Sequence, residues 1–254
     1  MIDLHLHLDG SLSPDTMLYL AKMGGISLPA DDAAGLKPYI TASNCGGDLN
    51  AYLKRFELPL LVLQSGFALE YAVDDLVMRL DAGHMRYAVI RFAPQLHTRA
   101  GLTQEEAVEA ALRGLECGLS KCRHLQAQLI LCCMRGEGNG RENERTVRLA
   151  ERYLHAGVAA VDLAGAEGVY KTEKYKGLFA LARELDVPFT IHAGEADGPQ
   201  SVRAAVEFGA RRIGHGVRMY EDASVMELVI DQGIALELCP TSNLQTGAVV
   251  GILN

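Results

Sequence analysis

Short apolar runs alternate with longer amphipathic stretches along the chain. The apolar runs predict strands at residues 2–7, 86–92, 127–133, 157–163, 187–192, 211–215 and 233–238. The amphipathic stretches predict helices, among them 104–119, 142–156 and 200–208. Strands that alternate with helices form βαβ units with parallel strands. Because the runs are apolar throughout, we expect helices to cover one face of each strand and a packed core to cover the other.

The first connection between strands is unusually long. The run Ser13-Pro14-Asp15 combines an N-cap, a proline at the first helical position and an acidic first turn, and it predicts a helix over 14–23 that ends at Gly24-Gly25. Residues 24–80 exceed an ordinary connection, and 50–64 has the pattern of one helix with an apolar face. Long insertions after a barrel strand often cover the active site, so we expect 24–80 to form a lid.

Length and element order predict an α/β fold of the (β/α)₈ TIM-barrel type. The chain has 254 residues, which is close to the roughly 250 residues of such a barrel, and 49% of them are hydrophobic. No linker divides the sequence, so we expect residues 1–254 to form a single domain. The pattern predicts seven strands where the barrel has eight, and the eighth strand is therefore expected to be missing from this chain.

The charge balance and the cysteines bear on partners and location. With 24 basic and 32 acidic side chains the formal charge is −8, which argues against nucleic acid as a partner. We find no cationic leader followed by an apolar stretch and no apolar run long enough for a membrane span. Nothing predicts an obligatory protein partner, and we expect a cytoplasmic protein with reduced thiols. The cysteines are at positions 45, 117, 122, 132, 133 and 239.

Histidines and one glutamate occur where predicted strands end. His5 and His7 lie on the first strand, His192 and Glu195 at the end of the fifth, and His215 at the end of the sixth. The carboxyl ends of barrel strands converge on the catalytic face. The i, i+2 spacing of His5 and His7 places both on the same side of their strand. The pattern therefore predicts a metal or catalytic site at this face.

The residue types favour zinc as the metal. Neutral imidazoles with few carboxylates are typical of zinc sites, whereas magnesium and calcium prefer oxygen ligands. Zinc would lower the pKa of a bound water, and Glu195 would act beside it as a proton carrier. The remaining histidines fall in helical or loop stretches and are interpreted as structural: His84, His97, His124 and His155.

The motifs at these positions resemble those of adenosine deaminases of the amidohydrolase superfamily. The resemblance runs from residue 2 to about 247 and rests on segments that follow one another in order. These are His5-Leu6-His7-Leu8-Asp9-Gly10-Ser11-Leu12, Asp162-Leu163-Ala164-Gly165, His192-Ala193-Gly194-Glu195, Gly214-His215-Gly216 and Cys239-Pro240-Thr241-Ser242-Asn243.

The resemblance implies a role for each matching residue. His5, His7 and His192 match zinc ligands, with one Zn²⁺ per chain. Glu195 matches the residue that protonates purine N1, and His215 matches the residue that holds and helps deprotonate the attacking water. The implied reaction is hydrolytic deamination of adenosine to inosine and ammonia.

Substrate contacts are implied in the same way. His7 and Asp9 match positions beside the nucleoside sugar, and Gly165 matches a backbone contact to the purine. Leu53 and Phe56, with Leu60, resemble an apolar lid over the base, although their helical spacing also fits a core-facing stripe. The partner is thus a small purine nucleoside. Two alternatives stay open, namely a deaminase for a modified adenine compound and a truncated remnant of the fold that binds purine or metal without catalysis.

Two departures from the family pattern lead to a prediction. Ala166 replaces an aspartate that often follows the glycine, and the Thr-Asp-Asp motif of the eighth strand, with the fourth protein ligand, is absent. Removing one barrel strand exposes two hydrogen-bonding edges beside the strand of His5 and His7. We therefore expect residues 1–254 alone not to be a competent catalyst. Deaminase activity and thermal stability should both rise when an eighth βα unit of the family is appended, and equal activity of this extended form would contradict the expectation.

Overall fold

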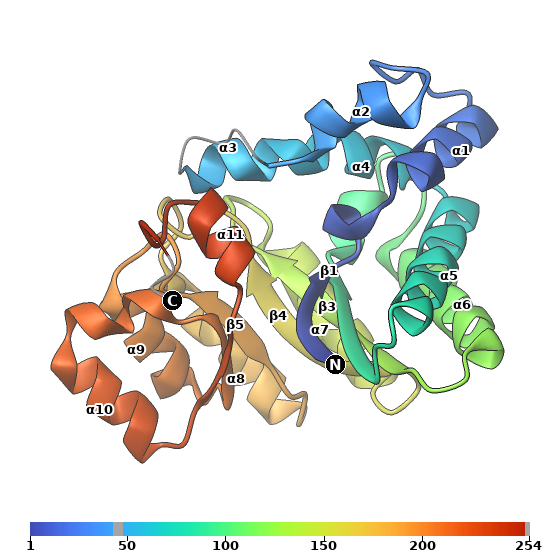
Figure 1. The fold of residues 1–254 in the computed structure, drawn as a ribbon. Coiled ribbons are helices and arrows are strands. Elements are labelled where there is room, and N and C mark those ends of the chain that lie inside the picture. Colours follow the sequence, from blue (N-terminus) through green and yellow to red (C-terminus); the bar gives the residue numbers. More distant parts are fainter. Residues whose placement is uncertain (43–47, 252–254) are drawn as a thin grey trace. The chain divides into compact units, whose positions relative to one another are not determined.

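Parallel strands separated by helices make up most of the chain (Figure 1). The computed structural model describes residues 1–42 and 48–251, so Cys45 lies outside the described residues. All seven predicted strands are confirmed, with ends that differ from the predicted ones by at most three residues. They are β1 (Ile2–His7), β2 (Tyr87–Phe92), β3 (Gln126–Met134), β4 (Val158–Ala164), β5 (Thr190–Ala193), β6 (Arg212–His215) and β7 (Ala235–Glu237).

The strands form two sheets. One has the order β1-β2-β3-β4 and the other the order β5-β6-β7. The pairs β1–β2, β2–β3, β5–β6 and β6–β7 are parallel, and a parallel bridge joins Val161 of β4 to Phe189. The interiors of β2, β3, β4 and β5 are almost wholly buried, as a sheet covered on both faces requires. The predicted α/β class is confirmed, and the described residues contain no eighth strand.

The chain divides into two compact units. Unit 1 comprises Met1–Ala42, Lys54–Leu131 and His155–Ala159, and unit 2 comprises the remaining residues. The single domain expected from the sequence stays a prediction.

Unit 1 carries the first helices of the chain. The N-cap expected before the first helix is confirmed, because the Ser13 hydroxyl accepts a hydrogen bond from the Thr16 amide at 3.0 Å. The helix ends at Gly24 and is capped by Gly25, whose φ of 64° suits glycine. Figure 1 shows α5 beside α6. The helices of unit 1 are α1 (Pro14–Gly24), α2 (Ala33–Ile40), α4 (Glu57–Val62), α5 (Gly66–Ala82) and α6 (Gln104–Lys121), with short 3₁₀ turns η1 (Asp9–Ser11), η2 (Lys54–Phe56) and η3 (Pro94–His97).

The segment expected to form one helix over 50–64 is divided into three. Helix α3 (Leu49–Leu53), the turn η2 and helix α4 follow one another. Pro59 accounts for the break, because proline has no amide hydrogen and its ring clashes with the carbonyl of the residue four positions earlier, which disfavours one continuous helix over 50–64. Because helix α4 begins at Glu57, Pro59 lies in its first turn, where proline is tolerated. The role of 24–80 as a lid stays a prediction.

Unit 2 continues the βα alternation. Its helices are α3, α7 (Gly140–Arg152), α8 (Lys176–Glu184), α9 (Pro199–Phe208), α10 (Ala223–Asp231) and α11 (Pro240–Gln245), with turns η4 (Thr172–Tyr175) and η5 (Val217–Glu221). Cys132 and Cys133 are buried on β3, and the described cysteines are thiols. Among the described residues no single helix has the length and apolar composition to cross a membrane, although the bent pair Leu49–Val62 and Gly66–Ala82 passes on length and composition together.

His97 is a buried histidine of unit 1. Its ring lies against Phe92, with centroids 5.7 Å apart, and its Nδ1 is 2.7 Å from the carbonyl oxygen of Leu63. The residue has no exposed surface. Burial lowers the pKa of His97 from 6.5 to about 4, because the charged imidazole would lose its hydration.

This burial predicts a pH-dependent stability. Between pH 6.5 and pH 4 the unfolded chain binds a proton at His97 that the folded chain does not, so stability is lost as pH falls through this range. From pH 7 to pH 5 the free energy of unfolding of the wild type should fall by about 2 kcal/mol more than that of His97→Gln. Denaturant unfolding at both pH values tests this, with the exposed His124→Gln as control. Equal pH dependence of wild type and His97→Gln would contradict the assignment.

Candidate active site

The predicted site residues divide between the two units. In unit 1 the structure places His5, His7, Asp9 and Phe56 together near the end of β1. The rings of His5 and His7 lie 5.3 Å apart, as their i, i+2 spacing predicts. The ring of Phe56 meets that of His7 edge-on at 6.2 Å. Both histidines are half-buried.

Asp9 is a buried carboxyl immediately after β1. Only 8% of its surface is exposed, and burial raises its pKa from 3.8 to about 6. One carboxylate oxygen accepts a hydrogen bond from the Gly10 amide at 3.1 Å, which lowers the pKa by a smaller amount. A side chain at position 10 would lie 3.0 Å from the Phe56 ring, so glycine at this position lets the ring pack over the turn after β1.

In unit 2 the pairing of β5 with β6 brings two of the predicted histidines together. The register joins His192 to Gly214 and Ala193 to His215, and the two imidazole rings lie 5.3 Å apart. The Nδ1 of His192 is 2.9 Å from a carboxylate oxygen of Asp162, which is fully buried two residues before the end of β4. In metal sites such a contact fixes the imidazole ring and leaves Nε2, the other nitrogen, available as a ligand.

Glu195 lies in the turn after β5, with 6% of its surface exposed. Its Oε2 is 3.5 Å from Nε2 of His215, and its Oε1 accepts hydrogen bonds from the hydroxyls of Thr246 at 3.0 Å and Ser242 at 3.3 Å. The Thr246 hydroxyl is also 3.0 Å from the Ser242 carbonyl oxygen. Since a hydroxyl has one hydrogen, Thr246 can donate it to that carbonyl and accept the proton of a neutral Glu195. The site therefore accommodates both protonation states of this carboxyl.

His215 is held in one tautomer. Its Nδ1 lies 2.7 Å from the amide oxygen of Asn243, so Nδ1 carries the hydrogen and Nε2 presents a lone pair on the side of Glu195. Burial lowers the pKa of His215, while the nearby Glu195 opposes this effect. The backbone φ of His215 is 66°, an uncommon value for a residue with a side chain and one that often marks a functional site. A neutral imidazole in this position can accept a proton at Nε2.

Two turns that carry the site pack directly against each other. The amide of Gly216 donates to the carbonyl oxygen of Ala193 at 2.9 Å. Gly194 has φ of 72°, and a Cβ at this position would lie 2.6 Å from Val202. Only glycine therefore permits this close approach without displacing α9.

The other predicted substrate residues also lie in unit 2. Gly165 follows β4 with φ of 107°, and a side chain there would approach Met134 and Arg135 to 3.4 Å. Leu53 ends helix α3 and is half-buried.

Several neighbours of the predicted residues received no role from the sequence. These are Asp162, Glu167, Ser242, Asn243 and Thr246. The sequence could have indicated a role for Asp162, because a charged residue near the end of an apolar strand is unusual. Asn243 lies in the Cys239–Asn243 motif, but the residue type alone did not indicate that its amide oxygen contacts His215.

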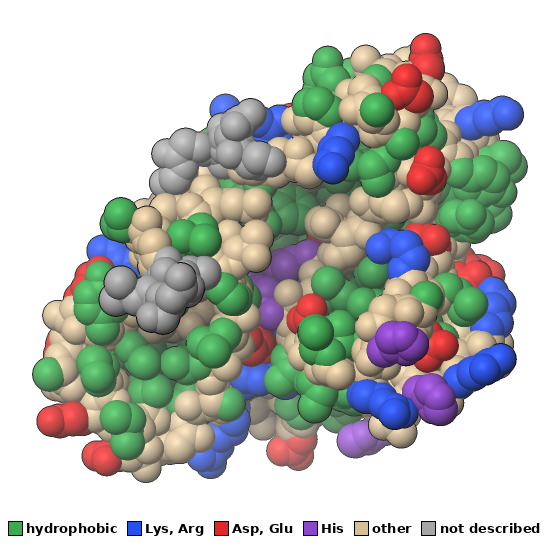
Figure 2. Space-filling model, in the orientation of Figure 1, with side chains coloured by type: hydrophobic (Ala, Val, Ile, Leu, Met, Phe, Trp, Pro, Cys, Tyr) green, Lys and Arg blue, Asp and Glu red, His purple; other side chains and the backbone are tan. Residues whose placement is uncertain are grey.

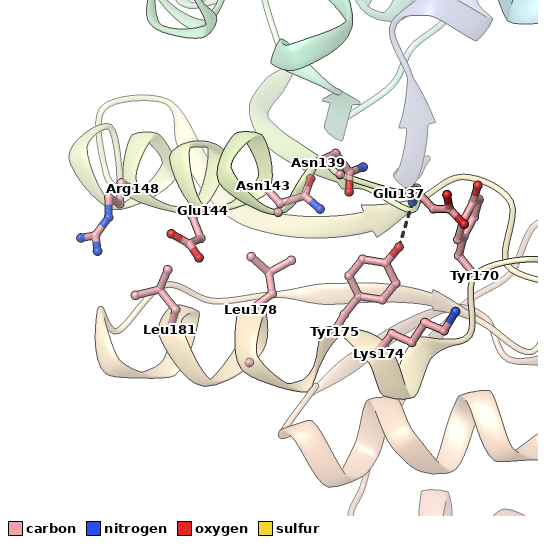
Figure 3. A pocket seen from close by; sticks show the side chains of 14 residues that line it. Glu137, Asn139, Asn143, Glu144, Arg148, Tyr170, Lys174, Tyr175, Leu178 and Leu181 are labelled. Atoms are coloured by element: carbon pink, nitrogen blue, oxygen red, sulfur yellow. Dashed lines mark hydrogen bonds between the residues drawn. The ribbon is translucent and has the colours of Figure 1, made fainter.

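A cavity of about 650 Å³ lies apart from these residues within unit 2. It is lined by α7, α8 and the loops that precede them, and none of the predicted site residues lines it. In Figure 3 the Tyr175 hydroxyl accepts the hydrogen bond of the Gly136 amide, at 2.9 Å.

Basic and acidic side chains are interspersed on the molecular face that Figure 2 shows.

The comparisons with known proteins identify the family. The family model described as adenosine deaminase matches residues 1–253. The chain therefore belongs to the adenosine deaminase family, whose members hydrolyse C–N bonds in cyclic amidines and deaminate adenosine or adenine compounds.

Individual relatives support this assignment. The chain is 53% identical over 252 residues to the adenosine deaminase of Haemophilus ducreyi, and the match covers 98% of this chain and 73% of the relative. Its structure is similar to that of an adenine deaminase from Arthrobacter aurescens, with a TM-score of 0.85, 28% identity and coverage of 98% and 75%. An amidohydrolase from Burkholderia ambifaria with bound Zn has the same fold, with a TM-score of 0.83, 20% identity and coverage of 96% and 66%.

Proposed function

We propose that the protein is a zinc-dependent deaminase that converts adenosine to inosine and ammonia, with Glu195 and His215 as its catalytic residues. The observation that carries this proposal is the buried pair itself. A carboxyl that can hold a proton and an imidazole that can accept one lie 3.5 Å apart, next to His192. The Haemophilus ducreyi relative, an adenosine deaminase, supports adenosine as the substrate.

His5, His7 and His192 fit the requirements of a zinc ligand set. Imidazole nitrogens are preferred ligands of Zn²⁺, and the Asp162 carboxylate on Nδ1 of His192 is the usual partner of a metal-bound histidine. The bound Zn of the Burkholderia ambifaria amidohydrolase supports the choice of metal. When bound, zinc supplies hydroxide at neutral pH by lowering the pKa of a water ligand to about 7.

The residues of this chain then divide the chemistry between them. Neutral Glu195 donates its proton to purine N1, which breaks the aromatic stabilisation of the ring and makes C6 electrophilic. His215 accepts a proton from the attacking water at Nε2. In the tetrahedral intermediate at C6, the amino group takes the proton that His215 had accepted and leaves as ammonia. The C6 hydroxyl returns its proton to Glu195 as the carbonyl of inosine forms, so both residues regain their starting states. The proposed role of Asn243 is to keep the His215 lone pair on the reacting side.

The remaining residues bind the nucleoside. His7 and Asp9 would contact the sugar, the backbone of Gly165 the purine, and Leu53 and Phe56 the face of the base. The position of the Phe56 ring over the turn after β1 supports its place in this set. A small purine nucleoside is thus the proposed partner. We also propose a cytoplasmic location, which the thiol state of the described cysteines supports.

The metal assignment predicts graded losses of zinc affinity. Asp162→Asn should weaken zinc binding by about 10- to 100-fold, because the amide cannot stabilise the ligating tautomer of His192 as the carboxylate does. His192→Ala should lose most of the affinity. Competition with a chelator measures both, with His97→Gln as the control for a buried histidine outside the site. Full zinc occupancy of His192→Ala would contradict the assignment.

The acid assignment predicts a selective loss of turnover. In the extended form, Glu195→Gln should lower kcat by about 10²–10⁴-fold and leave adenosine affinity within a few-fold, because it removes proton donation and little volume. Steady-state kinetics and calorimetric binding measure the two quantities. The exposed Glu184→Gln serves as the matched control. Turnover of Glu195→Gln within a few-fold of wild type would show that another group is the acid.

A further inference from the structure

Glu167 is a buried carboxylate that the mechanism above does not use. It lies three residues beyond the end of β4, and only 1% of its surface is exposed. It accepts five hydrogen bonds from the segment that contains the proton donor and from the helix after it. The donors to Oε1 are the Gly194 amide (2.6 Å) and the Ser201 hydroxyl (2.5 Å), and the donors to Oε2 are the amides of Glu195 (3.0 Å), Ala196 (2.7 Å) and Asp197 (3.0 Å).

The same network reaches the backbone of the metal-ligand strand. Ser201 is 2.6 Å from the hydroxyl of Thr172, which accepts a hydrogen bond from Arg135 at 2.9 Å. The Arg135 guanidinium also donates to the carbonyl oxygen of His192 at 2.7 Å. One buried acid and one buried base therefore hold the two ends of the turn from His192 to residue 197. The hydrogen bonds to Glu167 and those from the two terminal nitrogens of Arg135 offset the cost of burying both charges.

We propose that Glu167 is the positioning residue of the proton donor, because it fixes the backbone of residues 194–197 and so directs the Glu195 carboxyl toward His215 and Thr246. This inference rests on the proposed role of Glu195. Proton transfer depends on placing the donor within hydrogen-bond reach of the reacting atom, and a displacement of about 1 Å can cost about 10²-fold in rate. A turn of four residues with no regular secondary structure needs such an anchor.

The chemistry of the anchor requires a carboxylate. All five groups around Glu167 are donors, and an ionised carboxylate is purely an acceptor. In Glu167→Gln one oxygen is replaced by an NH₂ group, which has no lone pair for the N–H groups that face it. The volume is kept while part of the hydrogen-bond set is lost.

The first test follows the turn without reference to catalysis. In residues 1–254, Glu167→Gln should raise the hydrogen exchange rates of the amides of residues 195–197 by at least about tenfold, because these amides lose their acceptor. Asp81→Asn is the matched control, since the Asp81 carboxylate accepts the amides of Arg123, His124 and Leu125 in unit 1. It should leave exchange at 195–197 unchanged. Unchanged exchange in Glu167→Gln would overturn the proposal.

The second test is a double-mutant cycle in the extended form. Glu167→Gln should lower kcat by about 10- to 100-fold, with KM within a few-fold and zinc affinity unchanged. In the Glu195→Gln background the same change should lower kcat by less than about threefold, because the group it positions is gone. An equal loss in both backgrounds, or wild-type kcat in the single variant, would overturn the proposal.

Two further results keep the outcomes distinct. If Glu167→Gln does not fold, Ser201→Ala removes one donor to Glu167 and should lower kcat by about 3- to 10-fold, again only when Glu195 is present. Equal losses with and without Glu195 would overturn the proposal. If Glu195→Gln keeps wild-type turnover, the proposed role of Glu195 as the acid has failed, whatever the exchange rates show. Slow exchange of 195–197 in wild type and fast exchange in Glu167→Gln would then support the anchor alone.

Discussion

The parallel register between β5 and β6 is the constraint on which the site in unit 2 depends. This register pairs Ala193 with His215 and places the imidazole rings of His192 and His215 5.3 Å apart. The turns that follow β5 and β6 therefore begin side by side. The turns can then pack together through Gly194 and Gly216, and Glu195 emerges beside His215. A slip by one residue would turn every side chain of the strand to the other face and separate these groups.

Several ionisable groups are buried around this pair, and each is compensated by a specific partner. Asp162 contacts His192, Glu167 accepts five hydrogen bonds, and Asn243 orients His215. Burying such groups stabilises a fold less than apolar packing would, and removing one partner leaves the other uncompensated. The arrangement is therefore explained by chemistry at the strand ends, where perturbed groups are expected in an active site.

The sequence predicted the strands and the residues at their ends because both depend on local pattern. Apolar runs, the Ser13 cap and the His192–Glu195 motif are each readable within a few positions. The break of helix 50–64 was missed because a single residue, Pro59, overrides the periodicity. The role of Glu167 could not be predicted, since its partners lie about 30 residues away and the contact exists only after β4 and β5 come together.

The central claim is that these residues perform zinc-dependent deamination and do not merely bind a purine. The most direct measurement is ammonia release from adenosine by the extended form, followed together with the loss of ultraviolet absorbance at the purine band. The account predicts one ammonia for each inosine formed, no reaction after metal removal, and recovery of the reaction on addition of Zn²⁺. A protein that binds both zinc and adenosine but releases no ammonia would contradict it.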